Sequence, residues 1–81
     1  FKYKRVRLYW QDIVSNPEWL TLAKAKDQMY SWCEDTGYLL HKDQKKVIIF
    51  ASHSFDDDGE LSVGNTTTYP RSVVKKIEVL K

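Results

Sequence analysis

The residues best suited to chemistry in this chain are cations and aromatic rings that alternate near its N-terminus. If this segment is a strand, Tyr3, Arg5, Arg7 and Tyr9 share one of its faces. Cations attract phosphate and rings stack on bases, a combination found in grooves that bind nucleic acid. The same alternation also occurs on an ordinary outward face, where Arg and Tyr flank each other across a sheet. Both interpretations stay open, and a third is that this face binds a protein partner.

The charge of the chain is unevenly distributed, although its net value is only +2. Lys2, Lys4, Arg5 and Arg7 fall within the first ten residues, and residues 71–81 are also basic. The stretch between these two segments is acidic. If the first and last strands are neighbours, the basic segments form one face, and Lys76 then lies beside Arg5 and Arg7.

Other residue types that carry chemistry lack the spacing that their chemistry needs. Residues 56–60, Asp-Asp-Asp-Gly-Glu, do not follow the alternation of a calcium loop, so we interpret them as a solvated hairpin loop. His41 and His53 show no metal-binding spacing. Cys33 is the only cysteine and has no catalytic signature around it. We therefore predict a protein that is not an enzyme, with no catalytic residue, no metal site and no cofactor.

The elements that must position the basic and aromatic residues are mostly strands. Val6, Leu8 and Trp10 alternate with the polar face of a first strand, which spans residues 3–10. Extended segments are predicted at 29–40, 47–51 and 61–69, with turns at 42–45 and 55–60. The chain is short enough to form a single domain, residues 1–81.

One short helix is predicted at about 17–27, between the first two strands. Ser15 followed by Glu18 fits a capping box, and Asn16 before Pro17 fits an alternative cap. Trp19 and Leu22 repeat at helical spacing, so we expect them to pack onto the sheet.

The end of the chain favours a small barrel. Pro70 cannot continue a strand but suits the first position of a tight helical turn, and an alternating strand follows it. Strand, Pro-led turn and short final strand are the closing step of Src-homology-type barrels. The sequence therefore predicts a mostly β fold, a five-stranded SH3-like barrel with one short helix between strands 1 and 2.

The aromatic residues divide between the core and a surface. Trp10 is predicted to belong to the core, as is Trp19. Trp32 shares a strand face with Tyr30 and Tyr38. Three rings on an exposed face form a patch for a protein partner or for self-association, whereas the same rings inside a barrel are core. The sequence leaves these two alternatives open.

Several short motifs together resemble a class of small bacteriophage-encoded proteins. The motifs are Tyr9-Trp10-Gln11-Asp12, Thr36-Gly37-Tyr38-Leu39-Leu40, Val47-Ile48-Ile49-Phe50-Ala51-Ser52 and Tyr69-Pro70-Arg71 leading into Lys76-Ile77. Members similar to this chain carry a W-x-D opening, a G-Y-L-L strand and a proline before an Ile-rich final strand. The resemblance implies expression in the cytoplasm of an infected bacterium. It offers no catalytic residues to transfer.

Taken together, these features predict a non-enzymatic phage-type binding module that engages a host macromolecule as an inhibitor, anti-defence factor or accessory protein. A host protein is the expected partner, and a small nucleic-acid or nucleotide-binding barrel is the alternative. No apolar run approaches the roughly 18 residues of a membrane span, so no membrane partner is expected. Open edges and the aromatic face also favour a homo-oligomer. The predicted partner-binding residues are Tyr3, Arg5, Arg7, Tyr9, Trp32 and Lys76.

Overall fold

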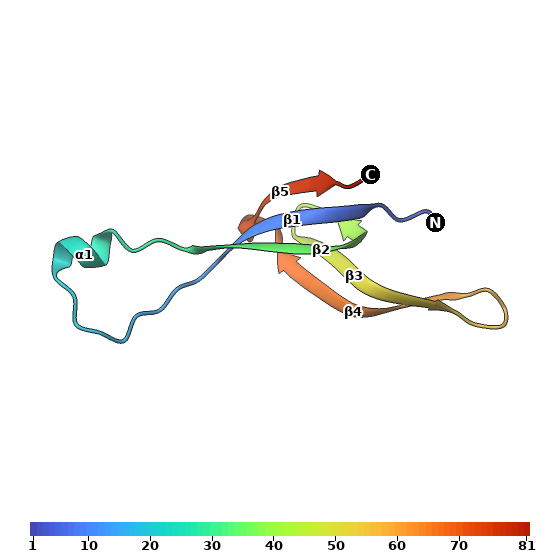
Figure 1. Cartoon of the computed structure of the whole chain (residues 1–81), viewed down its shortest axis with the longest axis horizontal. Coiled ribbons are helices and arrows are strands. Elements are labelled where there is room, and N and C mark those ends of the chain that lie inside the picture. Colours follow the sequence, from blue (N-terminus) through green and yellow to red (C-terminus); the bar gives the residue numbers. More distant parts are fainter.

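The computed structural model describes residues 1–81 as one five-stranded antiparallel sheet with two projecting segments (Figure 1). The strands lie in the order β4-β3-β2-β1-β5. The elements are β1 (Arg5–Asp12), α1 (Leu22–Lys26), β2 (Ser31–Lys42), β3 (Lys46–Phe55), β4 (Leu61–Pro70), the 3₁₀ turn η1 (Arg71–Val73) and β5 (Val74–Val79). The predicted mostly β fold, with a single short helix between the first two strands, is confirmed.

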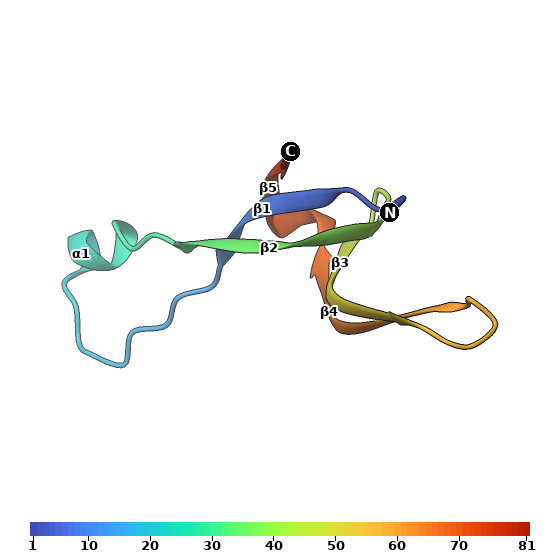
Figure 2. The same ribbon diagram turned by 45° about the vertical axis from the view of Figure 1, so that its right-hand side comes forward.

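The sheet is not closed into a barrel, and this corrects the SH3-like barrel predicted from the sequence. β4 and β5 are the two edge strands, and no ladder joins them. The chain crosses from one edge to the other through the Pro-led turn, where the Arg71 amide donates to the Lys45 carbonyl at 2.8 Å. The outer half of the β3–β4 pair runs away from β5 instead of curling toward it (Figure 2).

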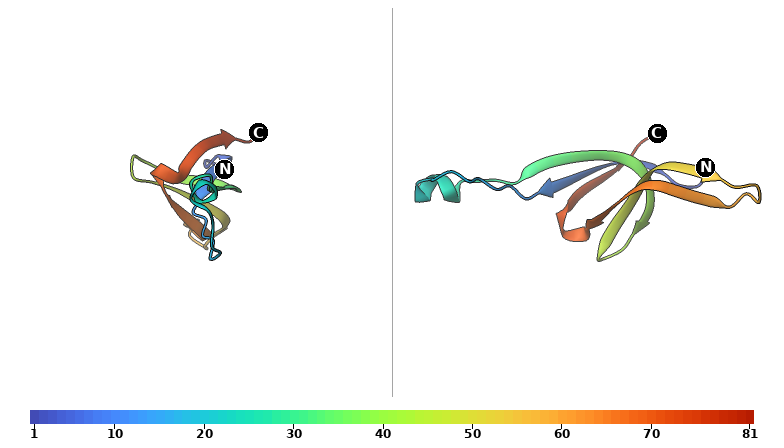
Figure 3. Two further views of the ribbon diagram at one scale, coloured as in Figure 1. Left: turned by 90° about the vertical axis from the view of Figure 1, so that its left-hand side faces the viewer. Right: turned by 90° about the horizontal axis from the view of Figure 1, so that it is seen from below.

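The molecule is elongated, with principal extents of 61 × 23 × 23 Å. Its radius of gyration is 17.2 Å. A compact chain of this length has about 12 Å. The excess comes from two segments that point in opposite directions, as the right-hand view of Figure 3 also shows. We call residues 13–30, between β1 and β2, the arm, and residues 52–64, at the end of the β3–β4 pair, the distal hairpin.

The core is small and lies on one face of the bent sheet. Val6 and Leu8 of β1 are fully buried because they alternate with outward residues and point into the concave side. Their buried neighbours are Val47, Ile49, Tyr69 and Val74, and Trp10 packs against this cluster as predicted. The core therefore gathers side chains from β1, β3, β4 and β5.

A polar network crosses the concave face and links β4 to two strands with which it does not pair. Trp10 of β1 donates its indole N–H to Asp35 Oδ2 of β2 at 3.0 Å. The hydroxyl of Tyr69, from edge strand β4, donates to the same oxygen. Burial, and then the hydrogen bond to Asp35, raise the pKa of Tyr69, so its hydroxyl stays protonated as a donor. The network thus ties β4 to β1 across the strands between them.

A second aromatic cluster covers the opposite face of the sheet. Phe50 follows the core residue Ile49 along β3, so its side chain points to the opposite face, where it is also fully buried. Its ring stacks on Tyr38 at 5.4 Å between centroids, and Tyr3 meets it edge-on at 5.6 Å. Gly37 lets β2 pass close to β3, because a Cβ at that position would lie 2.9 Å from the Phe50 carbonyl oxygen and 3.2 Å from Ile49 Cδ1.

The helix is shorter than predicted and packs on nothing. Thr21, rather than Ser15 or Asn16, caps it, and its hydroxyl accepts from the Lys24 amide at 3.3 Å. The prediction that Trp19 and Leu22 pack onto the sheet is wrong, because both side chains are exposed. The arm leads away from the sheet, so no surface lies opposite its apolar side chains (Figure 1).

The turn between β2 and β3 is organised by one carboxylate. Asp43 Oδ1 accepts from the amides of Lys45 and Lys46 at 2.7 and 2.8 Å. Its Oδ2 lies 2.7 Å from His41 Nε2. The hydrogen bond to His41 and those from the two amides lower the pKa of Asp43 to about 2.

The polar network predicts a large loss of stability on removing its acceptor. Asp35→Ala leaves the Trp10 and Tyr69 donors without a protein partner, and we expect the free energy of unfolding to fall by about 2–4 kcal/mol. Urea denaturation measures this change. Asp57→Ala, in an exposed loop without hydrogen bonds to its side chain, is the control and should change stability by less than about 0.5 kcal/mol. Equal effects of the two substitutions would contradict the role of the network.

The depressed pKa of Asp43 predicts a pH-dependent contribution to stability. Because the folded value lies below the unfolded one, the contribution is full above about pH 4 and is lost as the pH falls toward 2. We expect Asp43→Ala to lower Tm at neutral pH and the gap from wild type to shrink between pH 4 and 2. Thermal unfolding across this range measures it. A gap that is constant with pH would rule out the charge of Asp43 as its cause.

Candidate binding surfaces

The outward face of β1 and β5 brings three of the predicted partner-binding residues together. The strand register places Arg7 opposite Glu78 and Tyr9 opposite Lys76. Arg7 Nη1 lies 3.2 Å from Glu78 Oε1, and the Lys76 ammonium lies 5.5 Å from the Tyr9 ring centroid. The side chains therefore flank each other across the sheet.

The charge of this face is partly neutralised within the protein. Glu78 lies between two cations, since its other oxygen is 3.8 Å from Lys76 Nζ. The Tyr9 side chain, and more weakly Glu78, raise the pKa of Arg7, whose guanidinium is charged at neutral pH without this shift. Arg5 has no ion pair in the structure and is the unpaired cation of this set. A phosphate group would have to compete with Glu78 for Arg7 and Lys76.

Two predicted residues make their contacts away from the paired Arg7, Tyr9 and Lys76. Tyr3 precedes β1 and packs against Phe1 and Phe50, in the aromatic cluster that includes Tyr38, the cross-strand partner of Arg5. Trp32 lies opposite Gln11, at the base of the arm. It is 63% exposed, so this ring belongs to the surface rather than the core.

The arm is the most apolar exposed segment of the molecule. Trp19 has no protein neighbours that shield it and is 101% exposed, and α1 contains no buried residue. The other exposed apolar residues here are Ile13, Val14, Leu22, Met29, Tyr30 and, at its base, Trp32. The two legs of the arm form a shallow hollow lined by Ile13, Val14, Gln28, Met29 and Tyr30. Contiguous exposure of this kind is typical of an interaction site.

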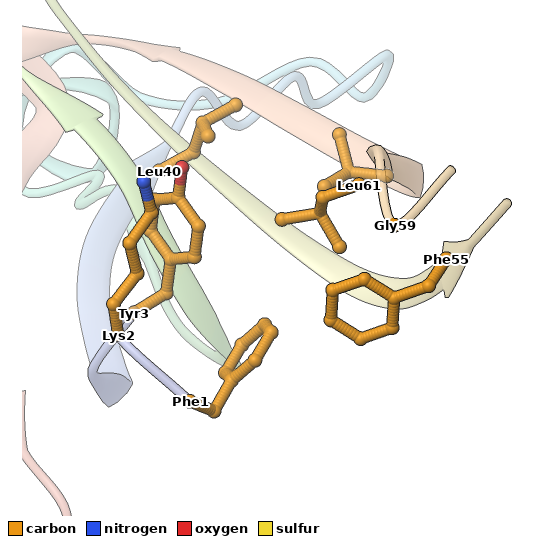
Figure 4. Close-up of a pocket in the computed structure, with 8 residues that line it drawn as sticks. Phe1, Lys2, Tyr3, Leu40, Phe55, Gly59 and Leu61 are labelled. Carbon is orange, nitrogen blue, oxygen red and sulfur yellow. The ribbon is translucent and has the colours of Figure 1, made fainter. Parts of the chain in front are cut away.

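A cleft opens at the other end of the molecule, where the N-terminal segment meets the distal hairpin (Figure 4). We call it the distal cleft. It has a volume of about 540 Å³ and is lined mostly by apolar side chains. Lys2, Tyr3 and Leu40 stand on one side of it and Phe55 and Leu61 on the other, with Phe1, Gly59 and Val63 completing the lining.

The remaining candidates for chemistry stand apart from one another. His41 bonds Asp43, whereas the His53 ring stacks on Phe1 at 4.5 Å between centroids. Cys33 is a half-buried free thiol. No three His, Cys, Asp or Glu side chains are grouped as metal ligands require. The structure also contains no helix with the length and apolar character of a membrane span.

Sequence reasoning missed the arm and the distal cleft as binding surfaces. The signal for the arm was present, since Trp19, Leu22 and Met29 are large apolar residues within a polar stretch. The cleft combines residues from positions 1–3, 40 and 55–63, and no local pattern brings these segments together.

Comparison of the chain with protein-family models, with curated proteins and with solved structures found no match.

The position of Glu78 predicts that this residue controls the charge of the basic face. Glu78→Gln removes the acceptor of Arg7 and the neighbour of Lys76, so we expect tighter retention on a heparin column. Glu60→Gln changes the net charge equally but lies in the distal hairpin, and it should raise retention less. The salt concentration at elution measures both variants. Equal shifts would show that the basic face does not act as one surface.

Proposed function

We propose that this protein is a non-enzymatic binding module that engages another protein through its arm and the adjacent Trp32. The observation that carries the proposal is the exposure of Trp19 in a segment without a folded surface behind it. Trp, Tyr and Met are the residue types enriched in the buried centres of protein interfaces. The arm offers all three.

The energetics of the arm support a docking role. An isolated helix as short as the five residues of α1 is not stable in water by itself. Ordering each residue costs roughly 1–2 kcal/mol of backbone entropy. Complete burial of one large apolar side chain stabilises by about 1.5–3 kcal/mol. The arm buries none of its own large side chains, so a partner surface is the natural source of this stabilisation.

The expected partner is a macromolecule of a bacterial host. This expectation rests on the resemblance to small bacteriophage-encoded proteins, and a module of that kind acts as an inhibitor, an anti-defence factor or an accessory protein in the host cytoplasm. The pairing of the first with the last strand, and the Pro-led turn before β5, support a relation to Src-homology-type barrels.

Pairing on the basic face favours a protein over nucleic acid as the partner. Arg7 and Lys76 already share Glu78, which leaves Arg5 as the cation free to meet a phosphate. Tyr3 is also engaged, in the aromatic cluster with Phe50. Nucleic-acid binding through this face requires the exchange of existing contacts, whereas the apolar side chains of the arm have no contacts to exchange.

The proposal predicts that arm variants lose a partner without losing the fold. Trp19→Ala combined with Leu22→Ala should abolish recovery of a stoichiometric bacterial protein in a pull-down, because interface centres depend on such anchors. Val79→Ala, at an exposed apolar residue of β5, is the matched control and should keep the partner. Unchanged Tm of both variants checks the fold. The proposal would be contradicted if the pull-down recovered nucleic acid and no protein. That nucleic acid should then be released steeply by salt and should be lost in the double variant Arg5→Ala plus Arg7→Ala.

A further inference from the structure

The two ends of the molecule carry exposed apolar surfaces, one that projects and one that is hollow. One end is the arm, which projects large side chains such as Trp19 and Leu22 into solvent. The other end is the distal cleft, a hollow of about 540 Å³ between apolar walls. Pockets of roughly 300–1,000 Å³ hold drug-sized apolar groups, so an indole ring fits within this one.

Helix α1 is basic and the loop of the distal hairpin is acidic, although Glu18 and Asp27 balance the two lysines over the arm as a whole. α1 presents Lys24 and Lys26, neither of which forms an ion pair in the structure. The rim of the cleft is the loop of the distal hairpin, where Asp57, Asp58 and Glu60 are exposed and likewise form no ion pair. Complementary charges of this kind orient two surfaces as they approach each other.

The arm cannot fill the cleft of its own chain. The arm and the distal hairpin project from opposite ends of a molecule 61 Å long, and the sheet lies between them. A contact between these surfaces therefore has to form between two copies. Trp19 and Tyr30 of the arm and Trp32 at its base, each able to bury roughly 150–250 Å², supply much of the roughly 800 Å² per partner that a stable interface needs. Ile13, Leu22 and Met29 add to that area.

We propose that the arm of one copy docks into the distal cleft of a second copy, with Lys24 and Lys26 against its acidic hairpin loop. The inference rests on the proposed function, because it takes the arm as the docking element and names a second copy as its partner. Two such contacts, formed reciprocally by two antiparallel copies, close the assembly as a dimer, the commonest closed arrangement of soluble proteins. A host protein that binds the arm then competes with self-association.

Reversal of the charges tests the contact in the purified protein. We expect Lys24→Glu with Lys26→Glu to raise the dissociation constant of self-association at least tenfold at low salt, measured by sedimentation. Asp57→Lys with Asp58→Lys, added in the same chain, should restore it because the opposite signs face each other again. Lys42→Glu with Lys45→Glu is the matched control, an equal charge change at the β2–β3 turn, and should leave association unchanged. Failure of the second pair to rescue the first would overturn the proposal.

A mixing experiment tests the apolar part of the contact. Trp19→Ala removes the arm anchor and Leu61→Lys places a charge in the cleft, so each variant alone should be monomeric. In an equal mixture, the Leu61→Lys variant supplies an intact arm and the Trp19→Ala variant supplies an intact cleft. We expect the mixture to recover part of the association. A mixture that stays monomeric while wild type associates would overturn the proposal, and so would wild type that is monomeric at every soluble concentration.

These outcomes separate the inference from the proposed function. Monomeric wild type that still captures a host protein through the arm overturns the second-copy contact and leaves the binding module standing. If self-association weakens and is restored as the charge-reversal variants predict, but no host protein is captured, the contact between copies is supported. The host partner is then removed from the proposed function.

Discussion

The fold depends on a contact that crosses the sheet rather than on closure of the sheet. Hydrogen bonds run continuously from β4 to β5 through the three central strands, but they do not join the two edges. What holds the far edge inward is Tyr69, whose ring is buried beside Val47 and whose hydroxyl bonds Asp35. Trp10 bonds the same carboxylate from the other side. The concave core exists because these three side chains keep the sheet bent.

A core held in this way remains small, and its size shapes the rest of the molecule. Eight of 81 residues are buried, so neither the arm nor the distal hairpin has a core of its own to fold against. Short chains in general bury a limited fraction of their surface. Here most of the exposed large apolar residues are gathered at the two ends of a long molecule, and Val79 of β5 is an exception.

Local chemistry explains which features could be predicted from the sequence. Alternation identifies β1 with Val6 and Leu8 inward, and the Pro70 turn is fixed by the residue itself. Helical spacing shows only that Trp19 and Leu22 share a face, and it does not show whether a surface lies opposite. The prediction of a closed barrel fails for a similar reason. Asn65, with φ at 53°, marks where the β3–β4 pair departs from the sheet. An alternation of apolar and polar residues does not reveal that bend.

The separation of the two apolar ends links folding to assembly. Within one chain, the cleft and the arm lie too far apart to shield each other, so the monomer exposes both. Any partner that binds the ordered arm also stabilises its order, by an amount that grows with the concentration of that partner. The sheet has its own buried core and does not need this stabilisation, whereas α1 does. In the proposed binding role, the sheet is a scaffold that folds around its own core, and α1 gains its stability from the surface that covers it.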